Sequence, residues 1–503
     1  MLLIKRLRLH KVWVFFLLKD GGKLFPQRLL FGFLFWLFIY ALASCEPKEE
    51  IITTDTSAQL EFSTDSVKFD TVFVNTTSVS RAVWVYNRHS KAVKITEIKL
   101  GLANPAYRLV VDGQETNQVN NILLRGEDSL LVVIKVKIPP TPDTAAFIQT
   151  DVLSFLTNTN RQRVALVSYG QNAYFHSKTE ITVNTIWKAD KPHVVYGSVN
   201  VAAGVKLEIE KGAKIYFHKD AALVINGRLE VKGAANKRVL FTGDRRERLY
   251  AAVPGQWQGI KFEATSTNNS IQFADIKNAT FGLWVANPDQ DETDYDLKIS
   301  QSVIQNMYET GILSYGADVQ ATNILITNCG QSAVMGLGGG NYEFTYCTLA
   351  NYTVGFRPGS VTLLFSDRLK VANGPNQDYR VKLSLQNSIV WAGKHGSDTA
   401  QDQILLKNEG KTTPVLQLNH SVLQTKNYLN HPAFVCCDNL LDVDPKFKAP
   451  IGGESINQPN FRLDTLSEVS NTARVIPAVI KDLEDKNRHL TTPDPGAYER
   501  LNP

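Results

Sequence analysis

Residues 58–172 alternate apolar and polar side chains over seven short runs, among them SVKFDTVFV, AVKITEIKL and DSLLVVIKVKI. A period of two residues places every second side chain on the same face of a strand, so each run predicts a half-buried β-strand. Asn, Gly and Pro separate the runs. Seven short strands with turn residues between them are typical of a β-sandwich, which we expect over 58–172.

The pattern changes from residue 185. Strand-like runs of four or five residues now alternate with Gly204, Gly212, Gly227 and Gly233. Such runs are too short and too evenly spaced for a sandwich. They predict a parallel β-helix over 185–430, in which each turn of the chain stacks on the previous one. The expected fold class is therefore all-β, a sandwich followed by a solenoid.

One phrase repeats four times within this region: an apolar residue, a spacer, an Asn, and then Gly or Ala four or five positions later. The asparagines are Asn278, Asn306, Asn328 and Asn351, at intervals of 28, 22 and 23 residues. A period in the low twenties corresponds to one coil of a β-helix. Asn tolerates left-handed backbone, and stacked coils bring like residues to within about 4.8 Å, so we expect a structural ladder of amides. A binding role for these residues is the alternative.

Several phrases resemble known families. VWVYNRHSKAVKITEI and LRGEDSLLVVIKV are similar to Hydin-like immunoglobulin modules, which implies an immunoglobulin-like sandwich without catalytic residues. The step from Gly227 to Gly233, with FTGD after it, resembles right-handed parallel β-helix proteins of the pectate-lyase-like superfamily. VDPKFKAP and PDPGAYER resemble, in degenerate form, the choice-of-anchor Q segment, and we expect residues 431–503 to cap the last coil.

The N-terminus indicates export. An apolar stretch from Leu29 to Ala43 follows basic residues and is short for a membrane span, so residues 1–44 are predicted to be a signal peptide; a true membrane anchor is the alternative. The sequence LASC resembles the lipobox of bacterial lipoproteins, which implies that Cys45 is acylated. Residues 45–57 would then be a tether. The Lys-Glu-Glu that follows resembles a signal for the outer face of the outer membrane.

Net charge excludes one class of partner. The formal charge is +5, but the first 44 residues contain seven basic residues and one acidic residue, so the remainder is close to neutral. No basic surface suited to nucleic acid is expected on the mature chain.

Cysteine spacing shows no zinc pattern. Cys329 and Cys347 lie in strand-like runs and are expected to be buried. The partners of the adjacent Cys436 and Cys437 stay open.

An acidic segment is the candidate calcium site, because hard carboxylate oxygens suit Ca²⁺. Its members are Asp289, Asp291, Glu292, Asp294 and Asp296. A loop that is merely solvated is the alternative, and no other cofactor is expected.

A basic and aromatic cluster is the candidate site for an acidic glycan, because Arg pairs with carboxylates and aromatic faces stack on sugar rings. The cluster consists of Arg245, Arg246, Arg248, Tyr250 and Trp257. The alternative is a solvated turn beside a core tryptophan.

Two functions from different classes remain. The favoured one is a lipid-anchored surface protein that binds a glycan or an envelope partner without chemistry. The alternative is a polysaccharide lyase or hydrolase, suggested by the β-helix resemblance; it requires converging acids and bases on one face of the stack. Its candidate residues are Arg357, Asp367, Arg368 and Lys370.

Overall fold

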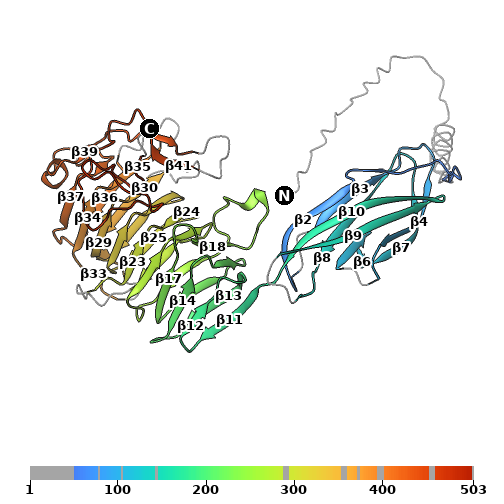
Figure 1. Cartoon of the computed structure of the whole chain (residues 1–503), viewed down its shortest axis with the longest axis horizontal. Coiled ribbons are helices and arrows are strands. Elements are labelled where there is room, and N and C mark those ends of the chain that lie inside the picture. The colour runs from blue at the N-terminus through green and yellow to red at the C-terminus, as the bar shows by residue number, and fades with distance from the viewer. Residues whose placement is uncertain are drawn as a thin grey trace, which may run out of the picture.

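The computed structural model describes residues 50–76, 80–103, 106–141, 146–286, 294–352, 360–370, 374–393, 402–451 and 459–500. Cys45 and the predicted signal peptide lie outside these residues. Over the described part the chain is nearly all-β, and two bodies follow one another along the sequence (Figure 1). Within that part, no helix is both long enough and apolar enough to cross a membrane.

The first body contains two five-stranded sheets. The strands of one sheet, in spatial order, are β1 (Glu61–Phe62), β3 (Arg81–Tyr86), β8 (Ser129–Val136), β5 (Tyr107–Val111) and β6 (Gln114–Thr116). Those of the other are β2 (Ser66–Phe73), β10 (Asn160–Gln171), β9 (Phe147–Thr157), β4 (Val93–Leu100) and β7 (Gln118–Leu124). Among the strand pairs of the described part of these two sheets, β2–β10 is parallel and the others are antiparallel.

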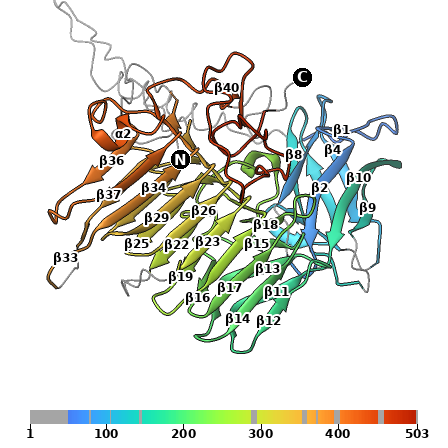
Figure 2. The same cartoon turned by 60° about the vertical axis from the view of Figure 1, so that its left-hand side comes forward.

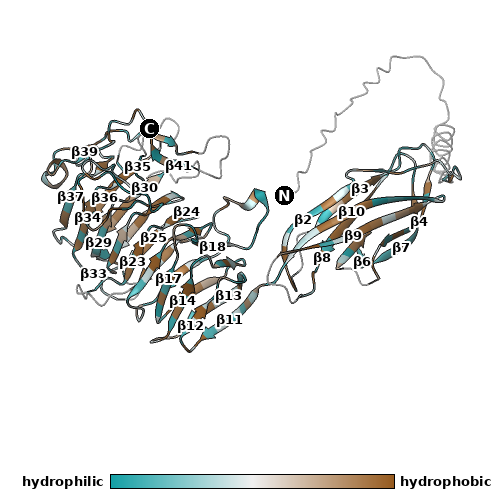
Figure 3. Cartoon of the chain, viewed as in Figure 1, coloured by the Kyte–Doolittle hydropathy of each residue, from teal (hydrophilic) through white to brown (hydrophobic). Residues whose placement is uncertain are grey.

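Alternation along these strands produces a single core between the sheets. On β8, Leu130, Val132, Ile134 and Val136 are buried, and the residues between them are more exposed. The inward side chains of both sheets join one hydrophobic cluster. Figure 3 shows the corresponding mixture of hydrophobic and hydrophilic residues along these strands. The period of two in the sequence therefore places alternate side chains in the core between the two sheets.

The second body is a solenoid with three faces of parallel strands, consistent with the predicted β-helix (Figure 2). The first face contains β12 (Thr185–Trp187), β14 (Lys206–Glu210), β17 (Arg228–Lys232), β20 (Asn269–Gln272), β23 (Leu297–Ser300), β26 (Val319–Thr322), β29 (Gly340–Thr345), β34 (Val381–Gln386) and β37 (Val415–Asn419). The second contains β15 (Lys214–Phe217), β18 (Val239–Gly243), β21 (Ala274–Lys277), β24 (Val303–Met307), β27 (Leu325–Cys329), β30 (Thr348–Asn351), β35 (Ile389–Ala392), β38 (Val422–Leu423) and β39 (Leu440–Leu441).

The third face contains β11 (Tyr174–Ile181), β13 (His193–Val201), β16 (Ala222–Ile225), β19 (Gly259–Phe262), β22 (Leu283–Ala286), β25 (Ile312–Tyr315), β28 (Val334–Leu337), β31 (Leu363–Ser366) and β36 (Ile404–Lys407). β13 also pairs with β15, so it contributes to two faces. The short strands β32 (Arg368–Leu369) and β33 (Gln377–Asp378) form a separate antiparallel pair.

Register explains why the sequence repeats. Ile276 on β21 pairs with Ile304 on β24, which in turn pairs with Ile326 on β27. All three are fully buried in one continuous core cluster. Each coil therefore places the same apolar side chain above its counterpart in the coil before, and stacking buries what one coil alone would leave exposed.

The predicted asparagine ladder lies at one corner of the coils. Asn278, Asn306 and Asn328 adopt φ values of 66°, 61° and 54°, in the left-handed region. Nδ2 of Asn306 donates to Oδ1 of Asn278 at 3.2 Å, and Nδ2 of Asn328 donates to Oδ1 of Asn306 at 3.4 Å.

Asn351 departs from this arrangement. It ends strand β30, and its Oδ1 instead accepts a hydrogen bond from the backbone N–H of Cys329 at 3.0 Å. That N–H is buried and would otherwise need another acceptor. The side-chain ladder observed therefore has three members, and the fourth asparagine bonds to backbone.

The C-terminal region does more than close the end. The short helix α2 (Pro432–Val435) inserts the fully buried Phe434 into the core of the last coil. After β40 (Phe447–Ala449) and β41 (Asn460–Leu463), the chain returns along the stack, and Lys481 O accepts a hydrogen bond from Asn323 Nδ2 at 2.8 Å. Residues 431–503 were expected only to cap the last coil; their described part also covers the flank of earlier coils, because corner side chains there hold the returning backbone.

Candidate binding groove on the solenoid

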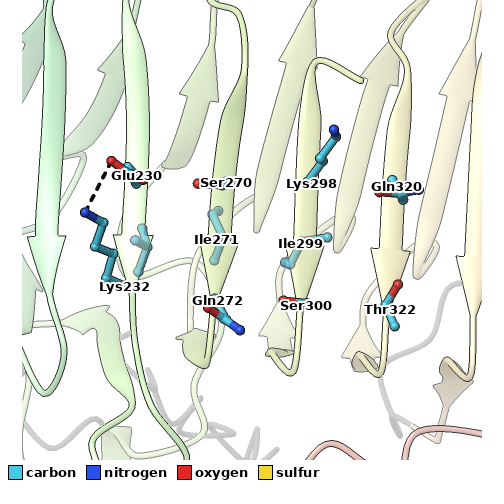
Figure 4. A pocket seen from close by; sticks show the side chains of 11 residues that line it. Glu230, Lys232, Ser270, Ile271, Gln272, Lys298, Ile299, Ser300, Gln320 and Thr322 are labelled. Atoms are coloured by element: carbon cyan, nitrogen blue, oxygen red, sulfur yellow. Dashed lines mark ion pairs between the residues drawn. The ribbon is translucent and has the colours of Figure 1, made fainter. Parts of the chain in front are cut away.

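An open groove of about 510 Å³ crosses β17, β20, β23 and β26 on the first face of the solenoid (Figure 4). Two rows of side chains follow from the strand register. The first row consists of Glu230, Ser270, Lys298 and Gln320. The second row consists of Lys232, Gln272, Ser300 and Thr322.

Alternation along each strand separates these rows from the core. On β20, Ile271 lies between Ser270 and Gln272 and is buried, and Ile299 holds the equivalent place on β23. In the first row the short side chain of Ser270 lies between the longer side chains of Glu230 and Lys298, which leaves space above β20. The polar surface of the groove thus rests on a rigid apolar layer.

An ion network borders the groove on the side of the first coils. Nζ of Lys206 lies 3.1 Å from Oε2 of Glu208 and 3.2 Å from Oε2 of Glu230. Nζ of Lys232 lies 2.9 Å from Oε2 of Glu208. Hydrogen bonds from Lys232 and Lys206 lower the pKa of Glu208. The charges at this end therefore neutralise one another.

A carboxylate borders the opposite side. Glu343 accepts hydrogen bonds from the hydroxyl of Tyr295 at 2.6 Å and from Nε2 of Gln320 at 3.0 Å. Burial, followed by the hydrogen bond to Glu343, raises the pKa of Tyr295 to about 12. Tyr295 consequently stays protonated at neutral pH and serves as a donor.

Lys298 lies between the two borders. Its side chain is exposed, and its Nζ is 5.8 Å from the centroid of the Tyr295 ring. The surrounding hydroxyls and amides both donate and accept hydrogen bonds. These groups repeat at the strand spacing of about 4.8 Å, which suits an extended ligand with many hydroxyl groups. An anionic group of such a ligand could pair with Lys298.

Sequence reasoning missed this groove, although a pattern for it exists. LEVK, NSIQ, LKIS and VQAT each place polar residues on both sides of one buried residue. The four segments look unrelated along the chain because two of the three intervals between their strands differ from the basic period. Only the strand pairing brings them side by side.

Trp257 does not offer a surface for sugar stacking. It is fully buried, lies 4.0 Å from Phe217 between ring centroids, and donates its Nε1–H to Lys277 O at 2.9 Å. Its assignment to the ligand site was wrong, because the indole completes the core of the solenoid. Arg245 covers the ring of Tyr250 at 3.7 Å and pairs with Glu247 at 3.2 Å.

Arg246 contacts both bodies. Its guanidinium carbon lies 5.5 Å from the ring centroid of Phe73 on β2 and 5.2 Å from that of Tyr216 on β15. Nη1 also donates to Oε1 of Gln171 at 3.2 Å. A hollow of about 310 Å³ adjoins this contact. Arg248 lies apart from it, in the 3₁₀ turn Arg248–Tyr250.

Three of the four candidate catalytic residues are described, and each is engaged in a structural contact. Asp367 is buried and accepts hydrogen bonds from Gly410 N at 2.8 Å and from Thr412 N and Oγ1 at 3.0 Å. Arg368 forms a two-pronged pair with Asp378 at 2.7 and 2.8 Å, which raises the pKa of Arg368. Lys370 lies 3.7 Å from Glu409, and Arg357 falls outside the described residues.

The five candidate calcium ligands do not form a common site among the described residues. Asp289, Asp291 and Glu292 lie outside the described residues, and Asp294 is exposed. Asp296 is buried at a corner, where its Oδ2 accepts from Asp318 N at 2.8 Å, and Asp318 Oδ1 in turn accepts from Asn341 N at 2.8 Å. No group of three or more potential metal ligands occurs among the described residues.

Comparison with known proteins identifies no family. No family model matches the chain, and neither does any curated protein. Similar solved structures include the ASH/PapD-like domain of human CEP192, at 16% identity, TM-score 0.16, and coverage of 26% of this chain and 94% of that one.

Two further solved structures resemble part of the chain. The Vibrio cholerae VesB protease is 11% identical with a TM-score of 0.16, over 24% of this chain and 33% of that one. A family 123 glycoside hydrolase from Clostridium perfringens is 7% identical with a TM-score of 0.16, over 23% and 26%. Similarities of this size assign neither a family nor an activity to the chain.

Proposed function

We propose that this chain is a lipid-anchored binding protein of the outer membrane, exposed at the cell surface, which contacts a glycan or cell-envelope partner without chemistry. In this proposal, acylated Cys45 attaches the chain to the membrane. The immunoglobulin-like sandwich spaces a right-handed parallel β-helix away from the lipid. The groove across β17, β20, β23 and β26 receives the ligand.

The observation that carries the proposal is the pair of polar rows on the first face. Eight outward side chains from four consecutive coils line the groove, and they are hydroxyls, amides and ammonium or carboxylate groups. They lie over a buried apolar layer, so their spacing is fixed before a ligand arrives. Preorganised polar groups reduce the entropy that binding costs.

A glycan array probed with the full chain tests the binding function. The informative variant is Gln272→Ala combined with Lys298→Ala, which removes one polar side chain from each row. Lys277→Ala on β21 is the matched control, because it removes the same charge as Lys298→Ala but from a neighbouring face, in the coil that carries Gln272. We expect binding of the wild type and of the control, and at least a tenfold loss in the groove variant.

Equal binding by both variants would overturn the assignment to the groove. Release of reducing or unsaturated ends from a bound acidic polysaccharide would instead favour a hydrolase or a lyase, and would contradict a purely binding function.

The anchor needs a separate test. Cells that express the chain are labelled with a radioactive fatty acid, and we expect label on the wild type and none on Cys45→Ala. Protease added to intact cells should degrade the labelled chain if it is exposed at the surface. Label that persists in the variant, or a protected chain, would contradict this part of the proposal.

A further inference from the structure

The last coil carries two exposed thiols on adjacent residues. Cys436 and Cys437 directly follow α2, and both are free. Cys329 and Cys347 are also free but lie in the solenoid core, where burial raises the pKa of each to about 12. Because the thiolate is the reactive form of cysteine and needs access to a partner, thiol chemistry among the described residues is confined to the exposed pair.

The backbone holds this pair in a fixed turn. Cys437 and Asp438 both adopt left-handed φ values, 66° and 57°. His420 N donates to Cys437 O at 2.9 Å, and Nδ2 of Asn439 donates to Cys436 O at 2.9 Å. Cys436 Sγ donates to Ala433 O at 3.7 Å, and a side-chain hydrogen bond with Cys436 raises the pKa of Cys437. The two exposed sulfurs therefore belong to one turn and to adjacent residues.

We propose that Cys436 and Cys437 are a reversible redox pair, whose oxidised form is a disulfide between the two adjacent residues and whose oxidant is a small-molecule disulfide. One thiolate attacks a sulfur of the oxidant, a new S–S bond forms, and the first thiolate leaves. The second cysteine loses its proton and attacks the mixed disulfide, which expels the second thiolate. Two electrons and two protons thereby pass to the oxidant, which becomes two thiols.

Adjacency makes the pair reversible rather than structural. Neighbouring Cα atoms are about 3.8 Å apart across a trans peptide, whereas bridged cysteines usually lie roughly 4.4 to 6.8 Å apart. An exposed bridge outside its usual geometry is easily reduced, as regulatory and labile disulfides are.

The turn is also coupled to the end of the solenoid. Phe434, two residues before Cys436, is fully buried and stacks on Tyr428 with 4.6 Å between ring centroids. Asn439 bonds Leu418 O at 2.7 Å as well as Cys436 O. Formation of the disulfide therefore changes the turn that directly follows α2 and its buried residue Phe434.

Oxidised glutathione is the probe for the test. The purified full chain is incubated with it in the native state, alkylated, and digested with trypsin, which releases residues 427–446 as one peptide containing both cysteines. We expect this peptide to lose two hydrogen atoms and both alkylation sites, and to regain both after reduced glutathione is added. Cys329 and Cys347 serve as internal controls and should stay unmodified until the chain is unfolded.

Cys436→Ser and Cys437→Ser separate the two steps. Each variant should stop at the mixed disulfide and keep one glutathione adduct. A wild type that also keeps an adduct, that links two chains covalently, or that retains both alkylation sites would overturn the proposal. The wild-type result decides even if a variant folds poorly.

Discussion

Arg488 and Asn323 are 165 residues apart in sequence, and Nη2 of the arginine donates to Oδ1 of the asparagine at 2.7 Å. Arg488 is only 4% exposed, lies 3.8 Å from the ring centroid of Tyr346, and also bonds the carbonyl oxygens of Asp494 and Gly496. One buried side chain thus joins the returning C-terminal chain to the corner between β26 and β27, where Asn323 lies.

Replacing Arg488 with Ala should destabilise the chain by about 3 kcal/mol, because it removes the cationic partner of the buried Glu499 and the donor to two backbone carbonyl groups. Chemical unfolding monitored by circular dichroism measures the change. Arg474→Ala is the matched control, since the hydrogen bonds of Arg474 come from its backbone and its side chain is exposed. Similar stabilities of the two variants would contradict the structural role of Arg488.

The asparagine ladder predicts a graded effect at Asn306. Asn306→Ala should cost about 2 to 3 kcal/mol, because it loses the amide bonds to Asn278 and Asn328 and places in left-handed backbone a residue that tolerates it less well than Asn does. Asn306→Gly loses the same bonds without the backbone penalty and should cost about 1 kcal/mol less. Thermal unfolding of both variants separates the two contributions, and equal losses would show that the backbone conformation contributes nothing.

Acid should loosen the first coil through two stacked histidines. His176 Nε2 lies 2.9 Å from His193 Nδ1, and their rings stack with Trp187. Burial, with a smaller contribution from His193, lowers the pKa of His176 to about 4. Burial also lowers the pKa of His193, against the opposing hydrogen bond with Lys188 O and the charge of Asp190.

The sign of the pH effect follows from proton binding. Between pH 6.5 and about 4 the unfolded chain binds a proton at His176 that the folded chain does not. The free energy of unfolding is therefore highest above pH 6.5 with respect to this site, and it falls as the pH drops through this window. The loss at this site is roughly 3 kcal/mol over that window. His176→Phe should flatten the decline in urea unfolding, whereas His89→Gln in the sandwich should not. An unchanged decline in His176→Phe would contradict this assignment.

Arg246 predicts how the two bodies are held together. Arg246→Ala removes contacts with Phe73, Tyr216 and Gln171, each worth about 1 kcal/mol, and we expect a wider spread of distances between the bodies. Small-angle X-ray scattering measures that spread. Arg245→Ala is the control, because Arg245 contacts Glu247 and Tyr250 of the solenoid alone. Identical scattering from wild type and Arg246→Ala would show that the arginine is dispensable for the junction.

One corner of the coils was predictable and another was not. Asn278, Asn306 and Asn328 repeat the same residue type, so their spacing revealed the coil period. A second corner also has left-handed backbone, but its six residues are of five types: Phe273, Gln301, Asn323, Tyr346, Asn387 and His420. Pairing of the flanking strands imposes that conformation, and no local preference marks it in the sequence.

The candidate sites show the same division. Trp257 was assigned beside an arginine cluster because sequence distance suggested a common surface, but its side chain points into the core. The groove residues were missed because Ser270 and Gln320 belong to different coils and meet through β20, β23 and β26.

The strand segments, the start of the stacked coils and the apolar side of each strand could all be predicted from the sequence, since these depend on the period of two and on turn residues close by. In contrast, the folded arrangement was needed to show which polar positions share a groove, which arginine is buried beneath the returning chain, and which carboxylates hold loops. Those outcomes depend on pairings between residues tens to hundreds of positions apart, and the lengths of intervening loops leave no regular trace of them along the chain.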